Sequence, residues 1–140
     1  MDRFLCPRAR LMVSVGLFCL VAILPGCGQG DGVQYQVSGT VTYGGQPVPA
    51  GQILFAPDTS KGNSGPAAAV GIVDGKYDTR NANRGTVGGP HVVTITGFDG
   101  KADPSGELPQ GQLLFSSYRM EVDLPTETAT QDFAVPANAQ

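Results

Sequence analysis

The chain has 140 residues and a formal net charge of −3 at pH 7, and 41% of its residues are hydrophobic. Its 20 glycines and 11 prolines interrupt the chain too often for long helices. Beyond residue 26 the lysines and arginines occur singly. This excludes a nucleic-acid-binding protein, because such proteins need clustered positive charge.

The N-terminus has the pattern of a secretory signal peptide. Arg3, Arg8 and Arg10 form a positively charged segment, and an apolar run of fourteen residues, 11–24, follows it. A membrane-spanning helix needs about 20 apolar residues, so this run fits a signal peptide better than a permanent anchor. The alternatives are a signal peptide cleaved at another small residue and an N-terminal helix that is not cleaved.

The sequence Leu24-Pro25-Gly26-Cys27 resembles the lipobox of bacterial lipoproteins, in which leucine stands three positions before the cysteine and a small residue immediately before it. Pro25 departs from the usual residue at its position. The resemblance implies signal cleavage between Gly26 and Cys27 and lipidation of Cys27 at the new N-terminus. The other two cysteines lie in the removed segment, so lipidation would also account for the single cysteine of the mature chain.

A lipidated Cys27 would tether the protein to a membrane, because each buried CH₂ of an acyl chain contributes about 0.8 kcal/mol. Residues 27–34 are rich in glycine and predict a flexible linker, and residues 35–137 are expected to form one domain. Among lipoproteins an aspartate after the cysteine commonly marks inner-membrane retention. Gly28 stands there instead, which favours a cell-envelope location at the outer membrane, facing the periplasm or the cell surface. Three of the nine cations and one of the twelve acids fall in residues 1–26, so the mature net charge is −5.

After the linker the dominant period is two residues, which is the period of a strand with one buried face. Apolar and polar residues alternate over 35–43 and predict a strand there. The apolar runs 53–55 and 67–73 are consistent with buried strands. Asp74-Gly75 is a strong signal for a two-residue hairpin, since a type I′ turn needs positive φ at both positions. Gly44-Gly45 predicts a similar turn after the first strand.

Strand patterns continue toward the C-terminus at 93–96, 120–124 and 133–135. Two longer segments, 80–90 and 99–112, are rich in glycine, proline, asparagine and aspartate and are predicted to be loops. No stretch after the signal peptide has the period of an amphipathic helix. About seven strands with frequent turns predict an all-β fold, an antiparallel β-sandwich.

Three early segments resemble the start of carboxypeptidase regulatory-like domains: Val37-Ser38-Gly39-Thr40-Val41-Thr42, Gly45-Gln46-Pro47-Val48-Pro49-Ala50-Gly51 and Ile53-Leu54-Phe55. Two later motifs of that family are similar to Gly75-Lys76-Tyr77 and Gly89-Pro90-His91-Val92-Val93, the second with proline and glycine exchanged. The resemblance covers residues 36–135. It implies an Ig-like, transthyretin-like β-sandwich, which in that family generally serves as a noncatalytic module.

The candidate chemical residues are few. His91 is the single histidine and begins a predicted strand, so a packed side chain is expected rather than a catalytic one. A zinc site needs three or four nitrogen or sulfur ligands, which the mature chain does not offer. Asp99, Asp103 and Glu107 would suit calcium, but Pro104 stands where an EF-hand loop has glycine, which favours a solvated loop.

Hydroxyisourate hydrolases of the transthyretin-like fold end in Tyr-Arg-Gly-Ser, whereas this chain ends in Ala-Asn-Ala-Gln. The sequence therefore predicts no enzyme, metal or cofactor.

Two functions of different classes fit these observations. The first is a noncatalytic structural or protein-interaction module that pairs an exposed edge strand with an envelope protein. The second is a glycan- or peptide-binding module that uses the loops 80–90 and 99–112 and an aromatic residue such as Tyr43, Phe98 or Tyr118. An exposed platform of these rings would favour glycan binding, and burial of all three would favour the interaction module.

Overall fold

The computed structural model describes residues 32–82 and 84–139. The predicted signal peptide, the predicted cleavage site at Gly26 and the predicted lipidation site at Cys27 lie outside these residues. In the described part of the chain, no helix is long and apolar enough to cross a membrane. The described strands are β1 (Val37–Tyr43), β2 (Gln46–Pro47), β3 (Ala50–Pro57), β4 (Ala68–Val73), β5 (Lys76–Asp78), β6 (Gly89–Phe98), β7 (Leu113–Leu124), β8 (Ala129–Thr130) and β9 (Phe133–Val135), with two 3-10 turns, η1 (Thr59–Lys61) and η2 (Thr79–Asn81).

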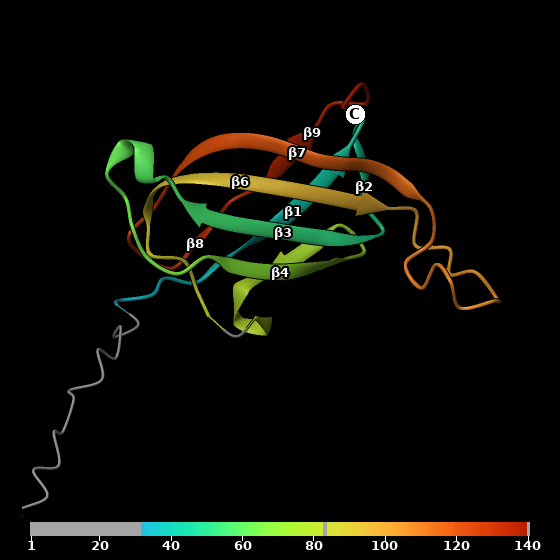
Figure 1. Ribbon diagram of the computed structural model, residues 1–140, viewed down its shortest axis with the longest axis horizontal. Helices are drawn as coiled ribbons and strands as arrows, with labels where there is room; N and C mark the ends of the chain where they lie inside the picture. Colours follow the sequence, from blue (N-terminus) through green and yellow to red (C-terminus); the bar gives the residue numbers. More distant parts are fainter. Residues whose placement is uncertain (1–31, 83, 140) are drawn as a thin grey trace, which may run out of the picture.

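The strands form one curled sheet with the order β2-β1-β5-β4-β3-β6-β7 (Figure 1). The short strands β8 and β9 also pair with β1 and run parallel to it. β1 crosses behind β3 and β6 in Figure 1, so the β5–β1–β9 end of the sheet covers the inner face of the β4–β3–β6–β7 layer. The fold is therefore all-β and sandwich-like, with its core between these two parts of one sheet.

Three aromatic rings join the two layers at the centre of the core. Phe55 on β3 and Phe133 on β9 each have their ring centroid 5.8 Å from that of Tyr77 on β5, and their own centroids are 6.1 Å apart. The Tyr77 hydroxyl donates a hydrogen bond of 2.6 Å to the carbonyl oxygen of Gln131. Burial of the Tyr77 ring raises the pKa of its hydroxyl well above the ordinary value. The aliphatic residues buried around these rings are Val37, Val41, Val48, Ile53, Val70, Ile72, Val93, Ile95, Leu124 and Val135.

Both predicted hairpin turns are present. Asp74 and Gly75 have φ values of 50° and 71° between β4 and β5, as a type I′ turn requires. Gly44 and Gly45 have φ values of 56° and 84° between β1 and β2. The Asp74 turn places β5 antiparallel to β4, and the sheet curls because β5 continues the pairing onto β1.

The C-terminal strands are held closely against β1. The Asp132 carboxylate accepts hydrogen bonds from the backbone N–H of Thr40 at 2.7 Å and from its hydroxyl at 2.9 Å. Gly39 lies directly against the carbonyl group of Gln131, and a Cβ atom at this position would overlap that carbonyl. Strand β1 at the beginning of the domain is therefore joined to the C-terminal segment that contains β8 and β9.

All the predicted strands are present, but several details differ from expectation. The runs 53–55 and 67–73 are not buried on both faces, because Leu54 and Val73 have exposed fractions of 39% and 68%. Within each run the outward side chains are also apolar or small, which conceals the period of two. Gly89, expected in a loop, begins β6. The parallel pairing of β8 and β9 departs from the otherwise antiparallel pattern.

Candidate functional site

The three aromatic residues named as binding candidates do not share one surface. Tyr43 stacks on Phe115 with 4.9 Å between ring centroids, and its hydroxyl donates a hydrogen bond of 2.8 Å to the carbonyl oxygen of Ala137. Tyr118 is half-buried and packs against the core. Phe98 is also half-buried, but it lies at the end of β6 and lines a hollow on the surface. Phe98 is thus the one of the three that is placed at a candidate site.

The two predicted loops lie at opposite ends of β6, which corrects the expectation of one surface built from both (Figure 1). The 80–90 segment is fastened to the beginning of the domain. The backbones of Tyr35 and Thr86 exchange hydrogen bonds of 2.8 and 2.9 Å, and the Gln34 side chain accepts a hydrogen bond of 2.9 Å from Gly85. The 99–112 loop projects from the other end of the molecule and borders the hollow beside Phe98, whereas the 80–90 segment does not line that hollow.

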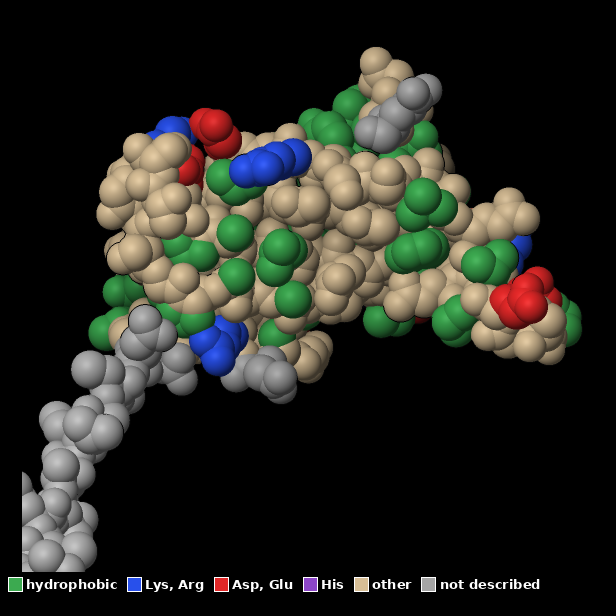
Figure 2. All heavy atoms as spheres, viewed as in Figure 1, with side chains coloured by type: hydrophobic (Ala, Val, Ile, Leu, Met, Phe, Trp, Pro, Cys, Tyr) green, Lys and Arg blue, Asp and Glu red, His purple; other side chains and the backbone are tan. Residues whose placement is uncertain are grey.

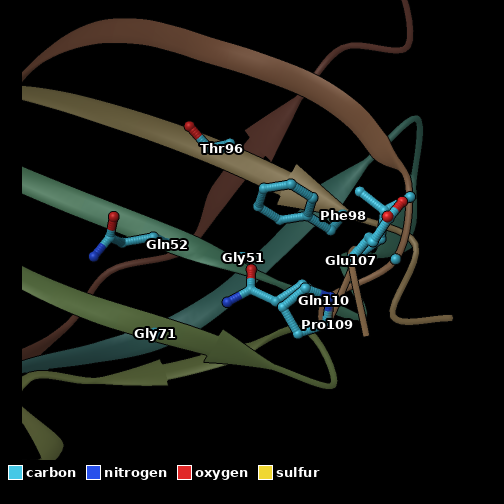
Figure 3. Close-up of a pocket in the computed structure, with 10 residues that line it drawn as sticks. Gly51, Gln52, Gly71, Thr96, Phe98, Glu107, Pro109 and Gln110 are labelled. Atoms are coloured by element: carbon cyan, nitrogen blue, oxygen red, sulfur yellow. The ribbon is translucent and has the colours of Figure 1, made fainter. Parts of the chain in front are cut away.

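The hollow has a volume of about 560 Å³ and lies on the outer face of β4, β3 and β6 (Figure 3). A single cross-strand row contributes Thr96 from β6, Gln52 from β3 and Gly71 from β4. The Phe98 ring and the Gln110 side chain extend over the sheet beside this row (Figure 3). Clefts of this size, with an apolar wall and a few polar groups, are typical of small-ligand sites. The loop residues that complete the lining are Glu107, Leu108, Pro109 and Gly111.

Gly71 differs from the other glycines in strands. Cβ atoms at Gly39, Gly51 and Gly97 would overlap neighbouring atoms, so tight packing requires glycine at these three positions. At Gly71 the nearest atom to such a Cβ is the carbonyl oxygen of Gly51, 3.9 Å away, and its φ is not positive. Glycine inside a strand normally weakens it and often marks a close approach of a ligand or another backbone. Packing within the described chain does not require glycine at position 71.

A second hollow adjoins the first at Gly71, which lines both. It has a volume of about 760 Å³ and lies where β5 diverges from β4, since these strands pair only at Val73 and Lys76. The polar residues in its lining are Ser38, Thr40, Lys76, Asp78, Asn81, Thr130 and Asp132. The two hollows therefore meet at Gly71, and the pair is called the depression from here on.

The outer face around the first hollow carries little charge. Figure 2 shows apolar and uncharged side chains over the centre of this face, with most of the charged side chains toward its margins. Glu107 is the one charged residue that lines the first hollow. Next to the polar row runs an apolar row, Val73, Ala50, Phe98 and Leu113, with one residue from each of β4, β3, β6 and β7. The first hollow thus offers neutral polar groups beside an apolar border.

The two aspartates of the 99–112 loop hold local turns. The Asp99 carboxylate accepts hydrogen bonds from the backbone N–H groups of Lys101 at 3.0 Å and Gln112 at 2.9 Å. Asp103 accepts a hydrogen bond of 2.8 Å from the backbone N–H of Ser105, which holds the pKa of Asp103 below its ordinary value. Over residues 32–82 and 84–139, no three acidic, histidine or cysteine side chains are grouped as metal ligands would be.

His91 is buried, with an exposed fraction of 1%. Its Nδ1 atom lies 2.9 Å from the carbonyl oxygen of Gly89, which can only accept, so Nδ1 carries the proton. Its Nε2 atom is buried without a hydrogen-bond partner among the described residues. No carboxylate orients the imidazole and no hydroxyl lies against it in that part of the chain, so the geometry is that of a packed side chain.

Comparison with protein-family models and with curated proteins found no match. The resemblance to carboxypeptidase regulatory-like domains therefore stays a prediction. Sequence reasoning singled out Phe98 and the 99–112 loop but not Gln52, Gly71 or Thr96. The sequence feature that could have indicated this site is Gly71 itself, because it is a glycine within an apolar strand and away from any turn.

Proposed function

We propose that this chain is a noncatalytic lipoprotein of the bacterial cell envelope, whose lipidated Cys27 tethers a β-domain that binds other envelope components. The observation that carries this proposal is the position of the two ends of the domain. Residues 32–35 and the 80–90 segment lie together, and the 99–112 loop projects from the opposite end (Figure 1). A tether at Cys27 would therefore hold the 80–90 segment toward the membrane and present the 99–112 loop away from it.

The polar side chains support a noncatalytic role. Asp58, Asp78, Asp99, Asp103 and Asp132 each accept hydrogen bonds from nearby backbone N–H groups, which fixes turns or joins strands. The single histidine, His91, is buried, and within the described residues its ring makes no hydrogen bond to a carboxylate or a hydroxyl group. General acid–base chemistry needs a titratable group within reach of a substrate, and these five carboxylates are engaged in the fold instead.

The end of the sheet away from the tether offers a surface for a protein partner. β7 pairs with β6 on one side, and no other described strand pairs with its second edge. Leu113 and Leu114 are exposed at the beginning of β7, whereas the charged residues Arg119, Glu121 and Asp123 occupy its later half. Charges discourage strand pairing, so the first part of β7 is the better edge for pairing with a partner strand.

A glycan- or peptide-binding role is the second candidate, favoured by the hollow beside Phe98. The hollow lies on the face of the sheet and the free edge lies on β7, so the two surfaces are separate. Both lie toward the end that a tether would hold away from the membrane.

The tether is tested by intact-mass measurement of the protein from membrane and soluble fractions of an expressing bacterium. We expect the wild type in the membrane fraction, beginning at an acylated Cys27, and Cys27→Ala released from that fraction. Cys19→Ala is the matched control, because it removes a cysteine from the predicted signal peptide and should leave the mature mass unchanged. An unmodified Cys27 in a soluble wild-type protein would refute the tether.

A further inference from the structure

We infer that the depression across the outer face of β6, β3 and β4 binds a neutral oligosaccharide, with Gln52, Thr96 and Gln110 as its polar contacts and Phe98 as its stacking surface. This inference deepens the binding role proposed above and does not depend on the lipid tether. It rests on the lining of the first hollow, on its meeting with the second at Gly71 and on the open space above Gly71.

The available polar groups suit sugar hydroxyls. Within the described residues, the side-chain amides of Gln52 and Gln110 have no hydrogen-bond partner. Each amide offers two donors and an acceptor, which matches a hydroxyl that both donates and accepts. The Phe98 ring lies beside them and supplies the flat apolar surface against which the C–H groups of a sugar ring can pack (Figure 3). Amide groups beside one aromatic ring are thus a combination suited to a neutral carbohydrate.

The charge of the depression disfavours anionic ligands. Glu107 is the one charged residue in the lining of the first hollow. In the second hollow the Lys76 ammonium is accompanied by the carboxylates of Asp78 and Asp132. Asp78 is engaged by Arg80 at 3.2 Å, and Asp132 by Thr40. An anionic ligand would meet more carboxylates than cations, whereas an uncharged one meets no such repulsion.

The backbone of this face is unsuited to an extended peptide. β3 is paired with β4 on one side and with β6 on the other, so its backbone N–H and C=O groups are already occupied. Peptides that extend a sheet bind at an edge, where these groups are free. A ligand on the face must be held by side chains, and the depression runs across the strands rather than along one of them.

Gly71 is the lining residue that the two hollows share. A side chain at this outward position would stand between the two hollows, and its Cβ atom would overlap no neighbouring atom. Gly71→Ile is therefore a change that blocks the depression without an overlap in the sheet, and isoleucine suits a strand. Ala69→Ile is its matched control, because Ala69 faces outward on the same strand but lines neither hollow.

The test is a titration of the full ¹⁵N-labelled chain, purified from the fraction in which it is found, followed by two-dimensional NMR. Cellohexaose, maltohexaose and chitohexaose are the probes, at millimolar concentration and in a detergent without a sugar headgroup if detergent is needed. We expect at least one hexasaccharide to shift the Gln52, Gly71 and Thr96 signals saturably. Gly71→Ile should abolish these shifts, Phe98→Ala should weaken binding about tenfold, and Ala69→Ile should retain it.

Three results would overturn the inference. The first is no saturable shift with any of the hexasaccharides. The second is binding that survives Gly71→Ile unchanged, since the ligand would then lie elsewhere. The third is a shift of the same signals by an uncharged hexapeptide of threonine, glutamine and alanine but by no sugar, which would make the depression a peptide site. A protein with lipidated Cys27 that binds no sugar would refute the oligosaccharide site alone, and a soluble protein that binds sugar would refute the tether alone.

Discussion

Removing the Tyr77 hydroxyl should lower stability by the net value of one partly buried hydrogen bond. Tyr77→Phe retains the ring between Phe55 and Phe133 but deletes the donor to the Gln131 carbonyl. A hydrogen bond of this kind contributes about 1 kcal/mol net. For a domain of about 100 residues, 1 kcal/mol corresponds to a decrease in melting temperature of about 4–8 °C. Thermal and urea unfolding would measure the change, with an unchanged urea m-value indicating that the native state is otherwise preserved.

Tyr43→Phe is the matched control for this experiment. It deletes a similar hydrogen bond, to Ala137, but at an exposed position where water replaces it, so the loss should be below about 0.5 kcal/mol. The pH dependence offers a second check. Because the folded state raises the pKa of Tyr77, its favourable contribution is complete below the ordinary value of 10.0 and is lost as the pH rises above it. Equal effects of the two substitutions, or a wild-type advantage that grows above pH 10, would refute the reasoning.

Three further predictions concern single residues. Asp132→Asn should lower stability at neutral pH. The hydrogen bonds from Thr40 hold the pKa of Asp132 below its ordinary value of 3.8, so the difference in stability from wild type should shrink as the pH falls through that lowered pKa. Acid unfolding curves of the two proteins would measure this difference. His91→Ala should lower the free energy of unfolding by about 2–4 kcal/mol because it creates a cavity. His91→Leu should cost less, because leucine refills most of that volume and only the Nδ1–H hydrogen bond to the Gly89 carbonyl oxygen is lost. Equal losses in urea unfolding would contradict a packing role. Gly71→Ala should leave stability unchanged or raise it by about 0.4–1 kcal/mol, because its Cβ atom meets open space. Gly39→Ala should lower stability markedly, because its Cβ atom would displace the Gln131 carbonyl group. The opposite order of melting temperatures would contradict the packing described for the two glycines.

The strands were predictable because one face of each is buried. The period of two over 35–43 and 93–96 reflects inward valines and isoleucines opposite outward polar residues, and the turn at Asp74 follows from the φ values that glycine and aspartate tolerate. The one-sided burial of β3 and β4 was not predictable from the apolar runs. Leu54 and Val73 are outward apolar residues, and a run without alternation cannot say which face is covered.

The separation of the two loops was available from the sequence once the strand between them was recognised. The 80–90 segment precedes β6 and the 99–112 loop follows it, and a strand of ten residues is about 33 Å long. Two segments that flank one strand must lie at its opposite ends. The depression itself could not be predicted, because it depends on the register that places Thr96, Gln52 and Gly71 in one row.

The pairing of β1 with the C-terminal strands also determines when the domain can fold. Thr40 and Asp132 are 92 positions apart, and the ring of Phe133 completes the centre of the core. Closing so long a segment adds little to the equilibrium cost, since loop entropy grows only with the logarithm of length. It does slow folding, because the rate falls as contacts become more distant in sequence. A ribosome or a translocation channel that still holds the last ten residues would therefore hold an open sheet, and a chain truncated before Phe133 would be expected to remain unfolded and accessible to proteases.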